Sequence, residues 1–483
     1  MNRDREIGER IDSTIPGRLD ALAWSPWHSR VVLALGITWI LDGLEASLVA
    51  NLGPTLQDSR TLGLTSTQVG LASSVYLVGQ VLGALVFGHL TDRSGRKKLF
   101  LVTLALYLAA TAASGLSPTF SIFLVFRFLA GAGIGGEYSA INSAIDELVP
   151  ARLRGRIDLA INGSYWIGVG AGAVLTLFLL DPARVPPAFG WRIAFGFGSI
   201  LGLAILFVRR DVPESPRWLL MHGYEAEAER TMTLIEQHAG VQRRKSASEG
   251  DAAITDETPK MTAVSVTGTV GFRHVFRTLF VKHRKRAVLA LALMLAQSFL
   301  YNAIFFSYGL ILQNFHHVRA DRVGLYMIPF AVGNFLGPLL LGPLFDRWGR
   351  RIMIPATYAL SGILLTATGA LFVLGKLDAI SQTASWCFVF FFASSAASSA
   401  YLTVSELFPI ELRGMVIAVF YAAATSIGAF APSLFGRIAG DKSPVPLFEG
   451  YVFASVLMIG AAIIARVYGV DSENKSLEEL NAA

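Results

Sequence analysis

The stretch GHLTDRSGRKK at residues 88–98 decides how the chain is interpreted, because a second copy, GPLFDRWGRR, stands at 342–351. Each copy has Gly at its first position, Asp-Arg at its fifth and sixth positions and Gly-Arg at its eighth and ninth positions. Each copy also lies between long apolar segments. A second motif also recurs, since DELVPARLRG at 146–155 resembles SELFPIELRG at 405–414. Two motifs that recur in the same order at nearly the same separation indicate that one half of the chain is a duplicate of the other.

The composition indicates an integral membrane protein. Hydrophobic residues make up 53% of the 483 residues and charged residues only 16%, whereas soluble proteins carry about 25% charged residues. The single cysteine, Cys387, and the eight dispersed histidines predict neither a disulfide framework nor a metal site. No phosphate loop, nucleophile elbow or metal-ligand spacing is present, so we expect no cofactor and no enzyme activity. The positively charged residues behind the net charge of +6 are distributed according to the predicted membrane topology, so this charge does not indicate nucleic-acid binding.

Apolar segments about 18–25 residues long recur along the chain, and each is long enough to cross roughly 30 Å of hydrocarbon as a helix. They predict an all-α integral membrane protein with twelve transmembrane helices in two six-helix bundles. The first six segments lie near 31–53, 67–90, 99–115, 121–146, 157–180 and 191–208, and the second six near 287–312, 323–345, 352–374, 382–405, 415–436 and 448–468.

The Lys and Arg residues predict the orientation. With the N-terminus in the cytoplasm, 32 of the 41 Lys and Arg residues lie on the cytoplasmic side, as positively charged loops prefer. Both termini are then cytoplasmic. The predicted parts are an N-terminal tail at 1–28, a first bundle at 29–210, a linker at 211–286, a second bundle at 287–470 and a C-terminal tail at 471–483.

The linker is expected to be heterogeneous. A short surface helix is predicted near 225–237, and a stretch of Ser, Thr, Ala and charged residues at 241–265 predicts disorder. Residues 273–286 are basic and apolar, which suits the cytoplasmic membrane surface. We expect the linker to act as a tether.

The motifs together resemble those of the major facilitator superfamily. RFLAGAGIGGEY at 127–138, PESPRWLL at 213–220 and ELFPIELRG at 406–414 resemble in particular the sugar-porter and metabolite–proton symporter families. The resemblance implies the major facilitator fold, with solute held between the two halves near the midplane. It also implies a monomer in the cell membrane that uses a proton gradient as its energy source.

The repeated motifs supply the predicted gating residues. Their charged side chains can pair across loops and helix ends, holding the halves together in one state and separating in the other. The alternative is that they only fix the topology and form tight turns. The predicted gating residues are Gly88, Asp92, Arg93, Gly95, Arg96, Glu147 and Arg154 in the first half and Gly342, Asp346, Arg347, Gly349, Arg350, Glu406 and Arg413 in the second.

Charged side chains within the apolar segments are functional candidates, because burial in a membrane is costly. Asp42 and Glu45 lie three residues apart and share one helix face, and Arg127 in the fourth segment could pair with Glu45. The resemblance implies that an acid at the position of Glu45 couples transport to protons. We predict that Glu45 carries the proton and that Arg127 is its partner. Asp42 belongs to the same group, although it could instead bond a backbone group.

The predicted substrate-binding residues are polar or aromatic side chains within the apolar segments. For several of them the alternative role is a buried hydrogen bond between helices. The glycines of the fourth segment, Gly131, Gly133, Gly135 and Gly136, are instead expected to allow close helix packing. The substrate-binding set is Glu137, Gln297, Asn302, Tyr165, Trp166 and Tyr401.

The sequence therefore predicts proton-coupled uptake of a small polar organic solute, a sugar, polyol or organic acid, by alternating access. The segment IGVGAGAVLTLF at 167–178 lacks the Gly-Pro pair typical of exporters in the superfamily, which favours uptake. The alternatives are a uniporter or a proton-antiporting exporter and, more remotely, a non-transporting sensor. The expected partners are the solute, protons and the lipid bilayer, with no nucleic acid.

Overall fold

A computed structural model gives the fold and describes residues 10–94, 96–149, 151–209, 213–239, 262–265, 277–408 and 413–469. The first half contains β1 (Arg10–Ser13), α1 (Ile15–Ala21), α2 (Pro26–Leu56), α3 (Ser66–Ser94), α4 (Arg96–Gly115), α5 (Phe120–Leu148), α6 (Ala151–Leu179) and α7 (Pro187–Arg209). The connection contains α8 (Pro216–Met221), α9 (Glu225–His238), β2 (Thr262–Ser265) and the π-helix η1 (Thr278–Lys282). The second half contains α11 (Arg284–His316), the 3-10 helix η2 (Ala320–Arg322), α12 (Val323–Arg347), α13 (Arg350–Val373), α14 (Ala379–Leu407), α15 (Arg413–Gly428), α16 (Phe430–Asp441) and α17 (Pro444–Tyr468).

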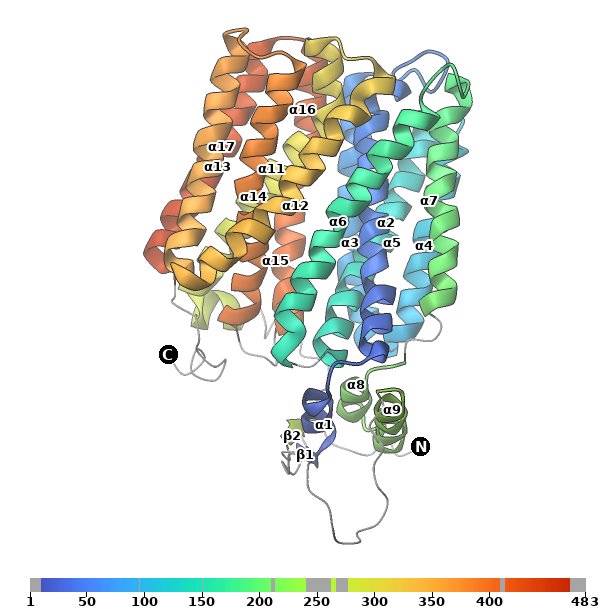
Figure 1. The fold of residues 1–483 in the computed structure, drawn as a ribbon, viewed down its shortest axis with the longest axis vertical. Helices are drawn as coiled ribbons and strands as arrows, with labels where there is room; N and C mark the ends of the chain where they lie inside the picture. The colour runs from blue at the N-terminus through green and yellow to red at the C-terminus, as the bar shows by residue number, and fades with distance from the viewer. Residues whose placement is uncertain are drawn as a thin grey trace.

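The long helices form two bundles that stand side by side (Figure 1). In one bundle α3 packs on α5, α2 on α6 and α4 on both α5 and α7. In the other, α13 packs on α17, α12 on α14 and α11 on α15 and α17. Nine helices in the described part of the chain are long and apolar enough to cross a membrane. Large apolar side chains such as Leu33, Ile200 and Val456 are more than half exposed on the outside, as lipid-facing residues should be.

The apolar segments predicted from the sequence lie on these helices, and one of them is divided. The segment 415–436 is shared between α15 and α16, which meet at Ala429. Pro432 explains the interruption, because it has no backbone N–H to donate to the carbonyl of Gly428 one turn earlier.

Glycines allow the helices within the first bundle to touch. A β-carbon at Gly131 would lie 2.0 Å from the carbonyl oxygen of Tyr76, and one at Gly135 would lie 2.0 Å from that of Gln80. No flexible side chain can move aside at these contacts, because the obstacle is backbone. The packing role predicted for this glycine run of α5 is confirmed.

The two bundles meet most closely at the end of the molecule away from α8 and α9. There α3 crosses α16, with Gly70 opposite Gly436, and the Ser433 hydroxyl donates to Ser74 Oγ at 2.7 Å. Nearby, Gln57, which follows the last residue of α2, donates to Gln313 on α11 at 3.1 Å. This contact, called here the far-end seam, is held by close backbone approach and neutral hydrogen bonds.

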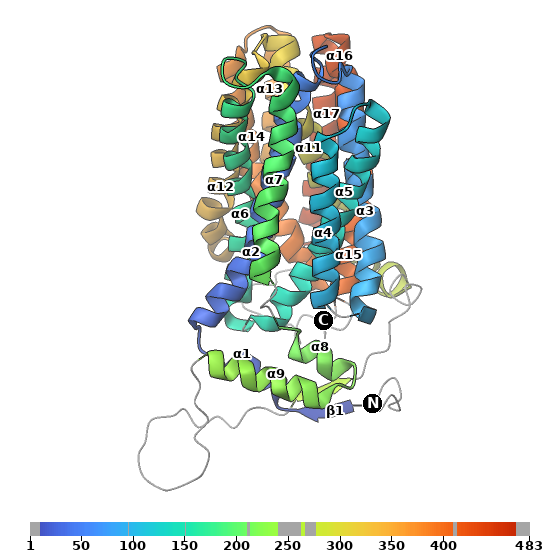
Figure 2. The same ribbon diagram turned by 90° about the vertical axis from the view of Figure 1, so that its right-hand side faces the viewer.

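At the opposite end, α1, α8, α9 and the β1–β2 pair form a small module beneath the first bundle (Figure 2). Ile15 and Leu19 of α1 share a buried apolar cluster with Met232 and Ile235 of α9. Arg18, whose side chain is only 4% exposed, binds Glu236 through two hydrogen bonds of 2.7 and 2.8 Å and also pairs with Glu229. The N-terminal segment is therefore docked on the linker.

The module changes the prediction for the linker. The surface helix near 225–237 is confirmed as α9. Disorder across 241–265 is wrong for 262–265, since these residues form β2 and pair antiparallel with residues 10–13. Residues 284–286 already belong to α11, and Leu279 in η1 is fully buried in the helical core. Leu279 therefore packs on protein, whereas Lys282, Arg284 and Lys285 are exposed, and a place for these basic residues at the membrane surface stays a prediction.

Substituting Arg18 by Met is expected to undock α1. Met keeps an apolar stem but removes the guanidinium, and it leaves the buried Glu236 carboxylate without this cation, a change that costs about 3–5 kcal/mol. Hydrogen–deuterium exchange over residues 13–22 should become faster. Arg217→Met is the matched control, because the ion pair of Arg217 with Asp20 is partly exposed and is worth about 1 kcal/mol or less. Unchanged protection of α1 in Arg18→Met would contradict the assignment.

Candidate functional site

A buried ion pair lies inside the first bundle. Arg127 on α5 forms an ion pair with Glu45 on α2, with Nη2 and Oε1 2.8 Å apart, and their side chains are 0% and 1% exposed. Thr111 on α4 donates to the other oxygen of Glu45 at 2.9 Å. The pairing predicted from the sequence is present, although these two residues are 82 positions apart in the chain.

The surroundings of Arg127 hold it in place. Its Nε and Nη2 both donate to Ser114 Oγ, at 3.2 and 3.1 Å. Its guanidinium also lies 4.7 Å from the ring centre of Phe195 and 5.5 Å from that of Tyr76. A buried pair of this kind is costly to break, because one charge is then left without a partner in a medium of low polarity.

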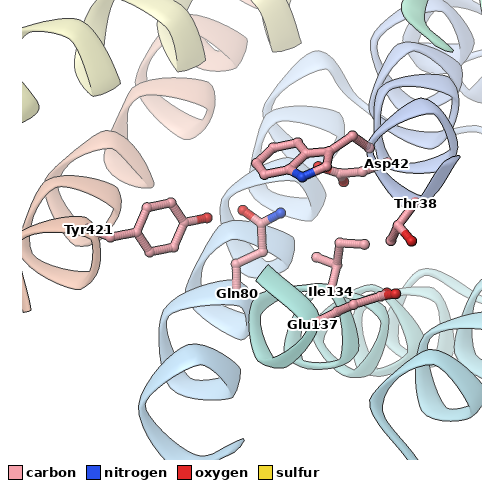
Figure 3. Close-up of a pocket in the computed structure, with 7 residues that line it drawn as sticks. Thr38, Asp42, Gln80, Ile134, Glu137 and Tyr421 are labelled. Atoms are coloured by element: carbon pink, nitrogen blue, oxygen red, sulfur yellow. The ribbon is translucent and has the colours of Figure 1, made fainter. Parts of the chain in front are cut away.

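A pocket lies beside this pair. Figure 3 shows the hydroxyl end of Tyr421 directed toward the side chain of Gln80. Because α15 of the second bundle contributes one wall and α2, α3 and α5 of the first bundle contribute the others, relative movement of the bundles would reshape it. The residues that line the pocket are Thr38, Trp39, Asp42, Gln80, Ile134, Glu137 and Tyr421.

Asp42 connects the pocket with the ion pair. Its carboxylate accepts a hydrogen bond from Tyr76 at 3.2 Å and interacts electrostatically with both Glu45 and Glu137. The ring of Tyr76 lies beneath Arg127. Tyr76 therefore touches the pocket acid with its hydroxyl and the buried cation with its ring. The structure brings Asp42, Glu45, Arg127 and Glu137 into one neighbourhood.

The other predicted substrate-binding residues lie outside the lining of this pocket. Asn302 donates within its own helix to the Ser298 carbonyl at 2.8 Å, and Gln297 is buried on the same helix. Trp166 packs against Tyr301 of the second bundle, with ring centres 6.0 Å apart. Tyr165 packs edge-on against Trp166, and Tyr401 is half-buried on α14. Their role in binding solute stays a prediction.

The predicted gating residues are only partly described. Gly88 and Gly342 lie within α3 and α12. Gly349 has φ of +84° immediately before α13, a conformation that favours glycine, so the tight turn is present in the second copy. Arg347 is exposed and Arg350 half-buried. The side chains of Asp92, Arg93, Arg96, Glu147, Arg154, Asp346, Glu406 and Arg413, and the whole of Gly95, lie outside the described residues.

Several neutral members of the site were not predicted from the sequence, namely Thr38, Trp39, Tyr76, Gln80, Thr111, Ser114 and Tyr421. A signal existed for two of them. Tyr76 and Gln80 lie four residues apart within the apolar segment 67–90, so they share one face of a helix. A polar amide in a membrane helix can be weighed in the same way as a charge, and Gln80 could have been found by that criterion.

Comparison with known proteins agrees with this architecture. A family model described as "Sugar (and other) transporter" matches residues 44–483. The niacin transporter NiaP of Acinetobacter baylyi is 26% identical over 477 residues, covering 96% of this chain and 98% of that protein. Myo-inositol transporter 2 of Schizosaccharomyces pombe is 26% identical, covering 94% and 82%. The xylose transporter XylE of E. coli, solved in a partially occluded inward-open conformation, has a TM-score of 0.72 at 19% identity, covering 94% and 100%. The expectation that the chain is a transporter and not an enzyme is confirmed.

Proposed function

Because the chain belongs to the sugar (and other) transporter family, we propose that it is a proton-coupled importer of a small polar organic solute that works by alternating access. The observation that carries this proposal is the buried Glu45–Arg127 pair beside a pocket that both bundles line. A carboxylate that is locked by a cation in one state and released in another binds protons according to conformation. Such a group couples proton movement to solute movement.

In this proposal the two bundles, residues 29–210 and 287–470, each cross the membrane six times, with α15 and α16 forming one crossing. The end that carries α1, α8 and α9 faces the cytoplasm, as the positive charge of the loops favours. The far-end seam then closes the external side, and solute reaches the pocket from the cytoplasm in this conformation. The protein is a monomer in the cell membrane and needs no cofactor.

Proteoliposomes test the proposal directly. The purified protein should accumulate solute against its gradient when a proton gradient is imposed, and an internal pH dye should report proton entry at the same time. We would begin with niacin, myo-inositol and D-xylose, the solutes in the names of the relatives. Equilibration without accumulation would favour a uniporter, and proton movement opposite to solute would favour an antiporting exporter. Either outcome would contradict symport.

A further inference from the structure

Tyr76 on α3 connects two parts of the site that must act together in a coupled transporter. Its hydroxyl donates to Oδ1 of Asp42, a residue of the pocket lining, at 3.2 Å. The centre of its ring lies 5.5 Å from the Arg127 guanidinium, close enough for a cation–π interaction. Among the described side chains that contact Arg127, Tyr76 is the one that also donates a hydrogen bond to a pocket residue.

The surroundings of Tyr76 leave its backbone little room to move. A β-carbon at Gly131 of α5 would lie 2.0 Å from the Tyr76 carbonyl oxygen, so α3 and α5 are in close backbone contact there. Tyr76 is only 1% exposed, and a hydrogen bond lost at a buried group is not replaced by bulk water. Because the hydroxyl lies on the axis of a rigid ring, a displacement at one end of this side chain also moves the other end.

We propose that Tyr76 is a positioning residue that links occupancy of the pocket to protonation of Glu45. A solute that bonds to Asp42 competes with the Tyr76 hydroxyl and shifts the ring against Arg127. Because Arg127 is the cation that pairs with Glu45, its displacement changes the affinity of Glu45 for a proton. The link is reciprocal, so protonation changes the affinity for solute by the same factor. This assignment rests on the proposed function and names a residue through which its coupling acts.

Several groups that titrate or carry charge surround Tyr76, so a test of the link must change one chemical group only. Tyr76→Phe meets this requirement, since it removes the hydroxyl and keeps the ring beneath the guanidinium. The surrounding groups are Asp42 and Glu45 from α2, Tyr107 from α4, Arg127 from α5 and Tyr165 from α6, with Glu137 from α5 next to Asp42.

Counterflow at equal pH on both sides of the membrane tests the link. Vesicles that contain the purified full-length protein are preloaded with niacin, myo-inositol or D-xylose, and the half-saturating external concentration is measured from pH 6 to pH 8. In the unmodified protein this concentration should change by about tenfold or more, because proton binding and solute binding are linked. In Tyr76→Phe it should change by about twofold or less, while the maximal rate of counterflow is retained.

Two further variants assign the effect to this contact. Tyr358→Phe is the matched control, because the buried Tyr358 hydroxyl donates to the Leu293 carbonyl at 2.9 Å within the second bundle, and it should keep the pH dependence of the unmodified protein. Asp42→Asn weakens the Tyr76 hydrogen bond from the other side, since a neutral amide oxygen is a weaker acceptor than a carboxylate. It should also reduce the pH dependence, and it covers the case in which Tyr76→Phe does not fold.

The outcomes separate this inference from the proposed function. If Tyr76→Phe keeps the full pH dependence, or if Tyr358→Phe loses it to the same extent, the inference is wrong, and proton-driven accumulation by the unmodified protein leaves the proposed function intact. Loss of counterflow in both Tyr76→Phe and Asp42→Asn would mean that the contact is needed for binding or movement itself, which also contradicts the inference. An unmodified protein that transports none of the three solutes, or that exchanges them without pH dependence, overturns the proposed function and this inference with it.

Discussion

Replacing Glu45 by Gln is expected to abolish gradient-driven accumulation of solute. If one proton accompanies each solute molecule, a gradient of two pH units supports about 100-fold accumulation, and this ratio should fall to about one in the variant. The amide keeps the size of the side chain but cannot bind and release a proton at the pH values on either side of the membrane. Transported solute and internal pH, followed together in proteoliposomes, give the measurement.

The same variant should still exchange solute. Counterflow needs the pocket and the movement of the bundles but no net proton transfer, so external label should enter vesicles preloaded with unlabelled solute. If Glu45→Gln keeps full accumulation under a proton gradient, Glu45 is not the coupling group. If it loses counterflow as well, the defect lies in folding or movement and not in coupling.

Stability measurements distinguish these cases. Arg127→Met alone leaves Glu45 buried without its cation and should lower the free energy of unfolding by about 3–5 kcal/mol. The double variant Glu45→Gln/Arg127→Met removes both charges and should recover much of that loss, because no unpaired charge remains. The double-mutant cycle therefore reports the interaction between the two side chains, which are in direct contact.

The sequence was sufficient for the parts of the fold that depend on local pattern. Apolar length located the membrane helices, and the rule that intramembrane charges need partners selected Glu45 and Arg127. The pair could be predicted because few other charged side chains lie within the apolar segments. Asp42 and Glu137 emerged for the same reason, and the structure places both in the pocket lining.

The parts that depend on contacts between distant, ordinary residues could not be predicted. Arg18 and Glu236 are 218 positions apart, and each belongs to a polar stretch in which charged residues are common. Tyr421 reaches the pocket from the other bundle, and a tyrosine in a membrane helix has many possible neighbours. The pairing of β1 with β2 involves two four-residue strands, too short to leave a clear pattern.

Replacing Gly70 by Leu is expected to open the far-end seam. A β-carbon at this position would lie 2.3 Å from the carbonyl oxygen of Pro432 and 3.1 Å from the α-carbon of Gly436. Both obstacles are backbone, so α3 and α16 must separate before the larger residue fits. Overpacking costs about 1–3 kcal/mol. A cost of this size shifts the equilibrium between the conformation with a closed far-end seam and the one with an open seam by about 5–150-fold toward the open conformation.

Spin labels on the two halves measure the separation. In a Cys387→Ser background, labels at Arg60→Cys and Asp441→Cys occupy exposed positions near the seam, and Gly70→Leu should lengthen the distance between them. Gly436→Leu should do the same from the opposite side, since its β-carbon would meet the backbone of Ser66 and Gly70. Gly460→Leu is the matched control, because nothing lies within 4 Å of a β-carbon there. An unchanged distance in both seam variants would mean that the backbone contact between Gly70 and Gly436 does not hold the halves together, and that the neutral hydrogen bonds of the seam are sufficient to keep this end closed.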